Sequence, residues 1–236
     1  MLRLLPVLTS WLIALPIALS LAIAAPARAD EKPGKPPGSE ICRKAIDAAE
    51  DAYGLPFGIL QAISMAESGR WDAGSRAVFA WPWTVTAHGT GKFYPTRKAA
   101  IAAVRRLKAA GTRNIDVGCM QINLYYHPHA FDSLEEAFDP RANSRYAARL
   151  FAELRKQSRS ISRAVAHYHS STRSRFLPYK HKVMDFWSQE RLRHYAELRR
   201  QKIAEWRARQ AALQAKRNAA MRADQRADAG ASAPDG

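Results

Sequence analysis

Apolar residues recur every three or four positions through most of residues 40–187. This spacing places them on one face of a helix, so the pattern predicts a mainly helical domain. Ser39, Thr96 and Asp139 are candidate N-caps, and Pro56 is expected in the first turn of the helix that follows it. The expected helices span residues 39–54, 55–69, 96–111, 139–157, 160–170 and 179–195.

Two segments, residues 81–95 and 114–123, break the helical pattern. In the first, Trp83, Val85 and Ala87 alternate with polar residues ahead of a Gly-Thr-Gly turn, which is typical of a short hairpin. The second is a strand-like entry followed by a tight glycine turn. The predicted fold class is therefore mainly α, with a small β-hairpin insertion.

The composition changes at about residue 188, where Arg, Ala and Gln become dominant. Between Glu190 and Arg226 there are 11 basic and 4 acidic residues, a net charge of +7. The apolar stripe is thin in this region, and Arg199 and Gln210 interrupt it, so it cannot support a strong core. We expect residues 188–236 to form a basic helical tail that becomes disordered from about residue 223.

The first 29 residues carry the features of an export signal. A short basic start precedes a long apolar run, and Ala-Arg-Ala at 27–29 is a small-x-small cleavage site. The run is long enough to span a bilayer as an uncleaved anchor, but Pro16 within it and the cleavage site favour a signal peptide. Residues 30–39 are then a flexible linker ahead of a domain at 40–187. Cleavage near Ala29 would make the protein periplasmic or secreted.

Glu67 stands out within the helix expected at 55–69. Leu60, Ile63 and Ser64 define its core-facing stripe, and the next position on that stripe is Glu67, within the last turn before Gly69. Such a carboxylate either escapes to solvent or lies in a partly desolvated site. Burial disfavours the charged form and raises the pKa, which suits a general acid at neutral pH.

Four further segments occur in a characteristic order. They are AES at 66–68, DVGCMQIN at 116–123, FDPRANSRYAARLF at 138–151 and AVAHYHSS at 164–171. Their order and spacing resemble the lysozyme-like superfamily, and within it the lytic transglycosylases with a soluble-transglycosylase (SLT) domain. The family pattern is Glu-Ser, then Gly-Leu-Met-Gln, then Asn before a helix, then Ala-Tyr-Asn-Ala-Gly. The resemblance covers roughly residues 40–187 and implies a lysozyme-like domain that cleaves the MurNAc–GlcNAc β-1,4 bond of peptidoglycan.

The resemblance also implies roles for individual residues. Glu67 would be the general acid and base, and Tyr168 would orient the reacting sugar and stabilise its charge. Asp116 lies in a segment that also resembles animal lysozymes, where the aspartate is the second catalytic carboxylate. Expected substrate contacts come from Ser68, Met120, Gln121, Asn123, Asn143 and His169. Each of three residues also has a structural alternative. Asp116 could simply hold the turn before Gly118, Tyr168 could only pack, and Gln121 could fix the loop backbone.

The sequence departs from the family pattern in two places. His169 replaces the asparagine after the tyrosine, and Ser171 replaces the glycine. The stretch from Trp81 to Asn114 is longer than the usual connection. Specialised transglycosylases of secretion systems and pili look similar around DVGCMQIN.

The His-x-His pairs at 127–129 and 167–169 lack an acidic or Cys partner at ligand spacing, so neither a metal nor a cofactor is expected.

The resemblance leaves three functions to separate. A lytic transglycosylase needs one catalytic carboxylate, because the substrate's N-acetyl group attacks and the 6-hydroxyl closes a 1,6-anhydro ring. A muramidase would use water with Glu67 and Asp116 about 5–5.5 Å apart. A non-catalytic wall-binding component of an envelope machine is the alternative from another class, and Glu67 within AES argues against it. The expected activity is that of a transglycosylase.

Charge and cysteine content bear on partners. The formal net charge of the chain is +16, and loss of Arg3 and Arg28 with the signal would leave +14. Peptidoglycan strands are the expected substrate, and the tail suits an acidic envelope partner or an anionic membrane surface. Nucleic acid is not expected as a partner of an exported protein. Cys42 and Cys119 are either bridged or two buried thiols, which their spacing leaves open.

Overall fold

A computed structural model describes residues 38–231 of the chain, with side-chain surroundings given for residues 38–226. The expected signal peptide and all but the end of the expected linker lie outside the described residues. The elements in chain order are α1 (Ser39–Ala52), α2 (Ile59–Ser68), β1 (Gly69–Asp72), β2 (Ala77–Ala80), β3 (Thr84–Ala87), β4 (Thr90–Phe93), α3 (Arg97–Ala109), β5 (Ile115–Val117), β6 (Ile122–Asn123), α4 (Leu134–Ala137), α5 (Pro140–Ser158), α6 (Ile161–His169) and α7 (Arg173–Ala231).

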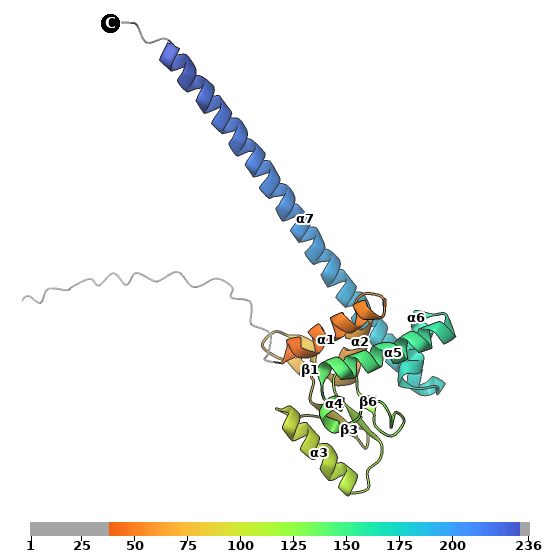
Figure 1. Cartoon of the computed structure of the whole chain (residues 1–236). Coiled ribbons are helices and arrows are strands. Elements are labelled where there is room, and N and C mark those ends of the chain that lie inside the picture. The colour runs from red at the N-terminus through yellow and green to blue at the C-terminus, as the bar shows by residue number, and fades with distance from the viewer. Residues whose placement is uncertain (1–37, 232–236) are drawn as a thin grey trace, which may run out of the picture. The chain divides into compact units, whose positions relative to one another are not determined.

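The described chain is mainly helical with small antiparallel sheets, which confirms the predicted fold class at this level (Figure 1). Its apolar residues form two clusters. The larger one lies among α1, α2, α5, α6 and the start of α7, and contains Ile46, Leu60, Phe151 and Val183. The smaller one lies between the sheet and helices α3 and α4. None of the described helices is both long enough and apolar enough to cross a bilayer.

Helix α2 is nearly enclosed by the rest of the domain, which sets the position of its last turn. Ile59, Leu60 and Ile63 are fully buried. A buried carboxylate caps the start of this helix, because Glu50 accepts hydrogen bonds from the backbone N–H groups of Gly58 at 2.7 Å and Leu60 at 2.6 Å. The placement of Pro56 in the first turn is wrong, since α2 begins three residues later at Ile59.

Local signals for the other helix starts have mixed outcomes. The Thr96 side chain accepts a hydrogen bond from the Ala99 N–H, and that of Asp139 accepts one from the Ala142 N–H, so both caps are confirmed. Ser39 instead is the first residue of α1, and Gly38 occupies the N-cap. The buried side chain of Ser39 has no hydrogen-bond partner among the residues that the structure describes, so it does not cap the helix.

The β structure is larger than the single expected hairpin. Strands β3 and β4 form that hairpin, and β3 also pairs antiparallel with β5, giving the order β4-β3-β5-β6. The four strands within residues 84–123 thus form one sheet, which places Asp116 of β5 beside Thr86 of β3. A second hairpin, β1–β2, directly follows α2 and was not predicted, because its residues lack a clear alternation.

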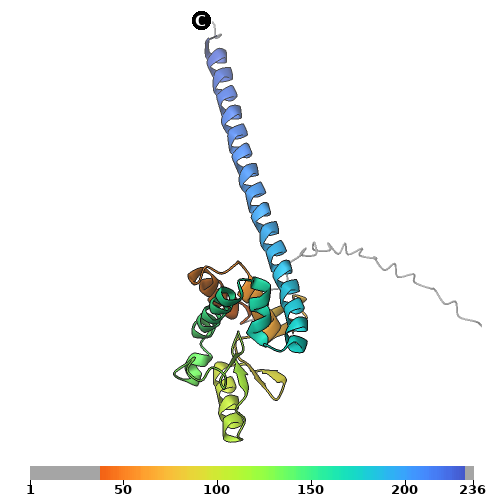
Figure 2. The ribbon, with the colours of Figure 1, turned by 90° about the vertical axis from the view of Figure 1, so that its right-hand side faces the viewer.

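Helix α7 differs most from expectation. It runs without a break from Arg173 to Ala231, so the boundary expected near residue 187 falls inside a helix, and residues 223–231 are helical (Figure 1). Its first turns pack beside α2 and α6 (Figure 2). Contacts with the domain continue past the expected boundary, because His194 stacks on Phe57 at 4.0 Å between ring centroids. High helix propensity of Ala, Arg and Gln explains why the helix persists after these contacts end.

Candidate active site

A cleft of about 440 Å³ lies where the sheet meets the helices. Its wall combines residues from distant parts of the sequence. The lining residues that the sequence singled out are Glu67, Asp116, Gln121, Asn123, Tyr168 and His169. Three segments expected to act together therefore do meet, from the end of α2, from the β5–β6 region and from the end of α6.

Glu67 lies at this cleft in a partly buried position, one residue before α2 ends. The pKa of its carboxyl group is raised to about 7, mainly because burial disfavours the charged form and in smaller part because of the nearby charge of Asp116. Tyr179 and Lys182, both from α7, act in the opposite direction and lower it. A carboxyl group with this pKa is protonated in a large fraction of molecules at neutral pH, as a general acid requires.

Tyr179 is the main site residue that the sequence did not reveal. Its ring is buried against His169, with the two ring centroids 4.4 Å apart and nearly parallel. Among the described residues, its hydroxyl has no hydrogen-bond partner within normal geometry. The hydroxyl nevertheless lies close enough to Glu67 to lower the pKa of that carboxyl group. Lys182 lies one turn further along α7 and donates from Nζ to the Ala66 carbonyl at 3.0 Å. The start of α7 therefore completes the surroundings of Glu67.

Tyr168 lines the cleft itself and makes a different contact. Its hydroxyl donates a hydrogen bond to the backbone carbonyl of Met120 at 3.0 Å. Burial raises the pKa of Tyr168 well above its usual value, and the nearby Glu67 and Tyr146 raise it further. Tyr168 thus remains a neutral hydroxyl that connects α6 to the loop between β5 and β6.

Asp116 is held by an amide rather than left free. Asn123 is its partner across the β5–β6 pair, and the Nδ2 of Asn123 donates to Oδ1 of Asp116 at 2.7 Å. Burial is the main cause that raises the pKa of Asp116, and the hydrogen bond from Asn123 opposes this effect. The side-chain oxygen of Asn123 accepts the N–H groups of Tyr125 and Tyr126, each at 3.0 Å. Asn123 thus orients Asp116 while it fixes the following turn.

Gln121 lines the cleft, but its carboxamide is mostly used within the protein. Nε2 donates to the carbonyls of Gly118 at 2.9 Å and Thr84 at 3.1 Å, and Oε1 accepts the hydroxyl of Thr86 at 2.6 Å. The backbone of Gln121 has φ of 48°, an uncommon left-handed conformation for a residue with a side chain. These contacts correspond to the loop-fixing alternative for Gln121 and leave one lone pair of Oε1 for a ligand.

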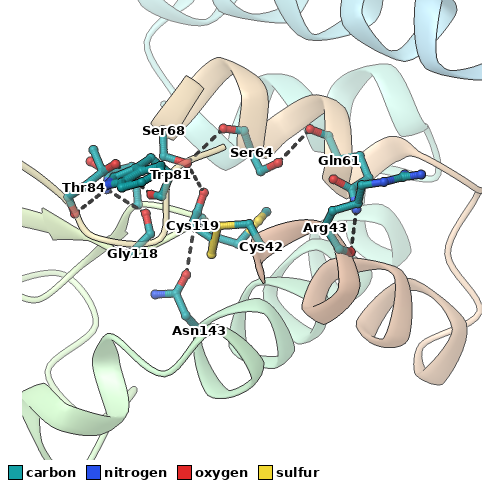
Figure 3. The surroundings of a disulfide bond; sticks show 12 residues. Cys42, Arg43, Gln61, Ser64, Ser68, Trp81, Thr84, Gly118, Cys119 and Asn143 are labelled. Carbon is teal, nitrogen blue, oxygen red and sulfur yellow. Dashed lines mark hydrogen bonds between the residues drawn. A yellow bond between two sulfur atoms is a disulfide. The ribbon is translucent and has the colours of Figure 1, made fainter. Parts of the chain in front are cut away.

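Three of the expected substrate contacts, Ser68, Met120 and Asn143, do not line the cleft. All are buried, with 1%, 0% and 0% of their surface exposed. The Ser68 hydroxyl donates to the Cys119 carbonyl at 2.6 Å, and Asn143 Oδ1 accepts the Met120 N–H at 2.9 Å, so the two hold the loop from opposite sides (Figure 3). The structure gives them positioning contacts in place of the expected contacts with a substrate.

The same loop is tied to α1 by a covalent bond. Cys42 and Cys119 form a disulfide with Cα atoms 5.7 Å apart, which resolves the two possibilities that the sequence left open (Figure 3). Gly118, beside it, has φ of 84°, and its α-carbon lies against the Asn143 side chain. Covalent and hydrogen-bonded restraints therefore converge on residues 118–121, of which Gln121 lines the cleft.

Polar residues that sequence analysis did not select complete the cleft wall. They are Thr86, Asn114, Tyr126, His127, Ser170 and Arg175. His127 shares a hydrogen bond of 2.9 Å with the hydroxyl of Tyr146, and burial lowers the pKa of its imidazole. No group of His, Cys, Asp and Glu side chains among the described residues is arranged to hold a metal ion. The cleft thus offers one carboxyl group tuned near neutrality, a second carboxylate, and hydroxyl and amide groups.

Comparison of the chain with protein-family models, with curated proteins and with solved structures finds no significant match in any of the three.

Proposed function

We propose that this protein is a lytic transglycosylase that cleaves the MurNAc–GlcNAc β-1,4 bond of peptidoglycan and leaves a 1,6-anhydro product. The observation that carries the proposal is the Glu67 carboxyl group, which lies at the wall of a polar cleft with its pKa raised to about 7. The lysozyme-like resemblance of the four sequence segments supports the same reading. A lysozyme-like fold is part of this proposal.

In the proposed mechanism, Glu67 acts first as an acid and then as a base. Its proton goes to the glycosidic oxygen as the bond from that oxygen to C1 of the MurNAc residue breaks. The carbonyl oxygen of the substrate's own N-acetyl group bonds to C1 and takes up the developing positive charge. The Glu67 carboxylate then removes the proton of the 6-hydroxyl, and O6 displaces the acetyl oxygen from C1. Water is not consumed, and Glu67 ends protonated.

The surroundings of Glu67 suit both halves of this cycle. Partial burial favours the protonated form that the first half needs. The Tyr179 hydroxyl and Lys182 lower the pKa of Glu67, which makes the carboxylate form accessible for the second half. A group whose pKa lies near the working pH can exchange its proton in both directions, and such acid–base catalysis contributes roughly 10²–10⁴-fold to the rate.

A muramidase is the second candidate, because Asp116 lies in the same cleft and its charge acts on Glu67. A retaining hydrolase of this kind needs its second carboxylate to act as a nucleophile on the anomeric carbon. Here Asn123 donates a hydrogen bond to Oδ1 of Asp116, and the same Asn123 side chain fixes the following turn. Both features favour a supporting role for Asp116, so the transglycosylase is preferred.

The products of purified peptidoglycan separate these candidates. The protein would be incubated with sacculi, and the soluble fragments would be analysed by mass spectrometry before and after borohydride reduction. Anhydro ends are one water lighter than hydrated ends and resist reduction, so unreduced fragments are the expected result. Reducible fragments would indicate a muramidase. Release of no fragments by wild type, with retained binding to sacculi, would overturn both and leave a wall-binding component.

A further inference from the structure

The distal part of α7 carries a face that no other described element covers. Between residues 192 and 221 its large apolar side chains are all exposed, including Leu192 at 67%, Tyr195 at 58% and Trp206 at 61%. Leu198, which is 38% exposed, lies to one side of the others, and the six remaining positions are 192, 195, 203, 206, 213 and 221. Their separations of three, seven or eight residues are close to whole helical turns, so the side chains form one stripe along the helix.

Basic residues flank this stripe. Lys202, Arg209 and Lys216 follow one another at seven-residue intervals along one side of it. Arg193, Arg200 and Arg207 do the same along the other side. Lys202, Arg209 and Lys216 form no ion pair among the described residues, whereas Arg193 and Arg200 pair with glutamates on their own helix.

The opposite face of the same segment is small and acidic. At helical spacing, Ala204, Ala208 and Ala215 lie there, together with Glu197 and Glu205. The helix is therefore amphipathic. It has a narrow apolar stripe with a band of basic residues on each side, and its opposite face consists mainly of alanine and glutamate. Tyr195, Lys202, Ile203 and Trp206 also bound an open hollow of about 590 Å³ on this surface.

We propose that this face of α7, residues 192–221, binds an anionic phospholipid bilayer and lies in the plane of its surface. Tyr and Trp favour the interface between water and hydrocarbon, and Lys and Arg side chains reach the phosphate groups while their methylene stems cover apolar surface. A straight stripe whose apolar and basic side chains recur along about 45 Å of helix suits a planar surface. The proposal concerns a different surface from the cleft and does not depend on the proposed function.

Other occupants fit the pattern less well. A second copy of the chain would bring two basic helices together, so the bands flanking each stripe would repel one another. Arg199 and Arg217 lie within the stripe itself, which limits how deeply it can enter an apolar groove on a protein. At a bilayer the same two guanidinium groups can remain at headgroup depth. Apolar insertion is therefore shallow, and charge supplies much of the attraction.

The test is sedimentation of the purified chain with phosphatidylcholine vesicles that contain or lack phosphatidylglycerol, at low and high salt. The informative variant is Trp206→Ser with Leu213→Ser, which keeps every charge. Its matched control is Ala208→Ser with Ala215→Ser, the same change on the opposite face. We expect wild type and control to bind anionic vesicles only, more weakly at high salt, and the stripe variant to bind about ten-fold more weakly.

Each other outcome overturns the proposal. Equal binding by the stripe variant would reduce the attraction to charge alone, without a role for the apolar stripe. Absence of binding to anionic vesicles would contradict the bilayer and assign the face to a protein partner instead. A dimer that the stripe variant dissociates, measured by sedimentation equilibrium without lipid, together with absent vesicle binding by wild type, would assign the face to a second copy. Glycan release and thermal unfolding, measured in parallel, should be the same for all three proteins.

Discussion

The hydroxyl of Tyr179, near the start of α7, lies beside the carboxyl group of Glu67, at the end of α2, and lowers its pKa. The two residues are 112 positions apart in the chain. Burial is the largest cause that raises the pKa of Glu67, and Tyr179 opposes it. Tyr179 thus contributes to the proton affinity of the group on which the proposed function rests, and the first predictions test it.

Replacement of Glu67 by Gln should abolish the proposed activity without harming the fold. The amide matches the carboxyl group in size but cannot donate a catalytic proton, so glycan release should fall by roughly 10²–10⁴-fold or more. The variant avoids the cost of ionising a partly buried carboxyl group, so its melting temperature at pH 8 should equal or exceed that of wild type. Muropeptide release and thermal unfolding measure the two effects. Retained activity would remove Glu67 from the mechanism.

The pH dependence of kcat/KM should report the titration of Glu67. Because the protonated form is active in the first step, the rate should fall as the pH rises through about 7. Tyr179→Phe removes a group that lowers this pKa, so the alkaline limb should move to higher pH. Tyr168→Phe is the matched control, because the Tyr168 hydroxyl is bound to the Met120 carbonyl. An unchanged limb in Tyr179→Phe, or an equal shift in both variants, would contradict the assignment.

Asp116→Asn separates the two candidate chemistries. The amide can still accept the hydrogen bond from Asn123, so the turn should be preserved. Loss of the Asp116 charge should lower the pKa of Glu67, which moves the alkaline limb of the rate profile to lower pH. We expect a substantial fraction of activity and unchanged anhydro products at pH 6. A loss as large as that of Glu67→Gln, with hydrated products in wild type, would establish the muramidase instead.

The disulfide should contribute a large part of the stability of the domain. It closes a loop whose ends are 77 positions apart, and a bridge across a loop of this length typically stabilises by about 2–4 kcal/mol. The double variant Cys42→Ser with Cys119→Ser should therefore unfold at lower denaturant concentration. Dithiothreitol should destabilise wild type in the same way and leave the double variant unaffected. Equal stability of wild type with and without reductant would show that the bond does not form in solution.

Two glycines allow a matched test of the loop at residues 118–121, which ends at the cleft residue Gln121. Gly118 and Gly111 have nearly the same φ, 84° and 82°, so alanine at either position costs about 1–2 kcal/mol of backbone strain. Beyond this, a Cβ at Gly118 would lie 2.5 Å from Nδ2 of Asn143, whereas one at Gly111 meets nothing within 4 Å. Gly118→Ala should therefore be clearly more destabilised than Gly111→Ala in denaturant unfolding, and should also lose glycan release. Similar losses of stability would contradict a tight fit between Gly118 and Asn143.

Local patterns in the sequence account for most of the helices and for the core of the candidate site. Thr96 and Asp139 cap helices through atoms three residues away, so a short stretch of sequence specifies the contact. Glu67 follows a buried stripe at helical spacing, so its approach to the interior is also encoded locally. The segments containing Asp116, Gln121 and Tyr168 were expected to meet Glu67 through the family resemblance, and all line one cleft with it.

Tertiary structure alone decided which side chains tune or support the site. Tyr179 and Lys182 look like ordinary residues of a helix until α7 packs against α2, because the contact depends on distant segments. Ser68 and Asn143 carry groups suited to a sugar, but complete burial turns them toward the backbone of the loop. A polar group removed from water must find a partner in the protein, and only the assembled fold determines which partner lies within reach.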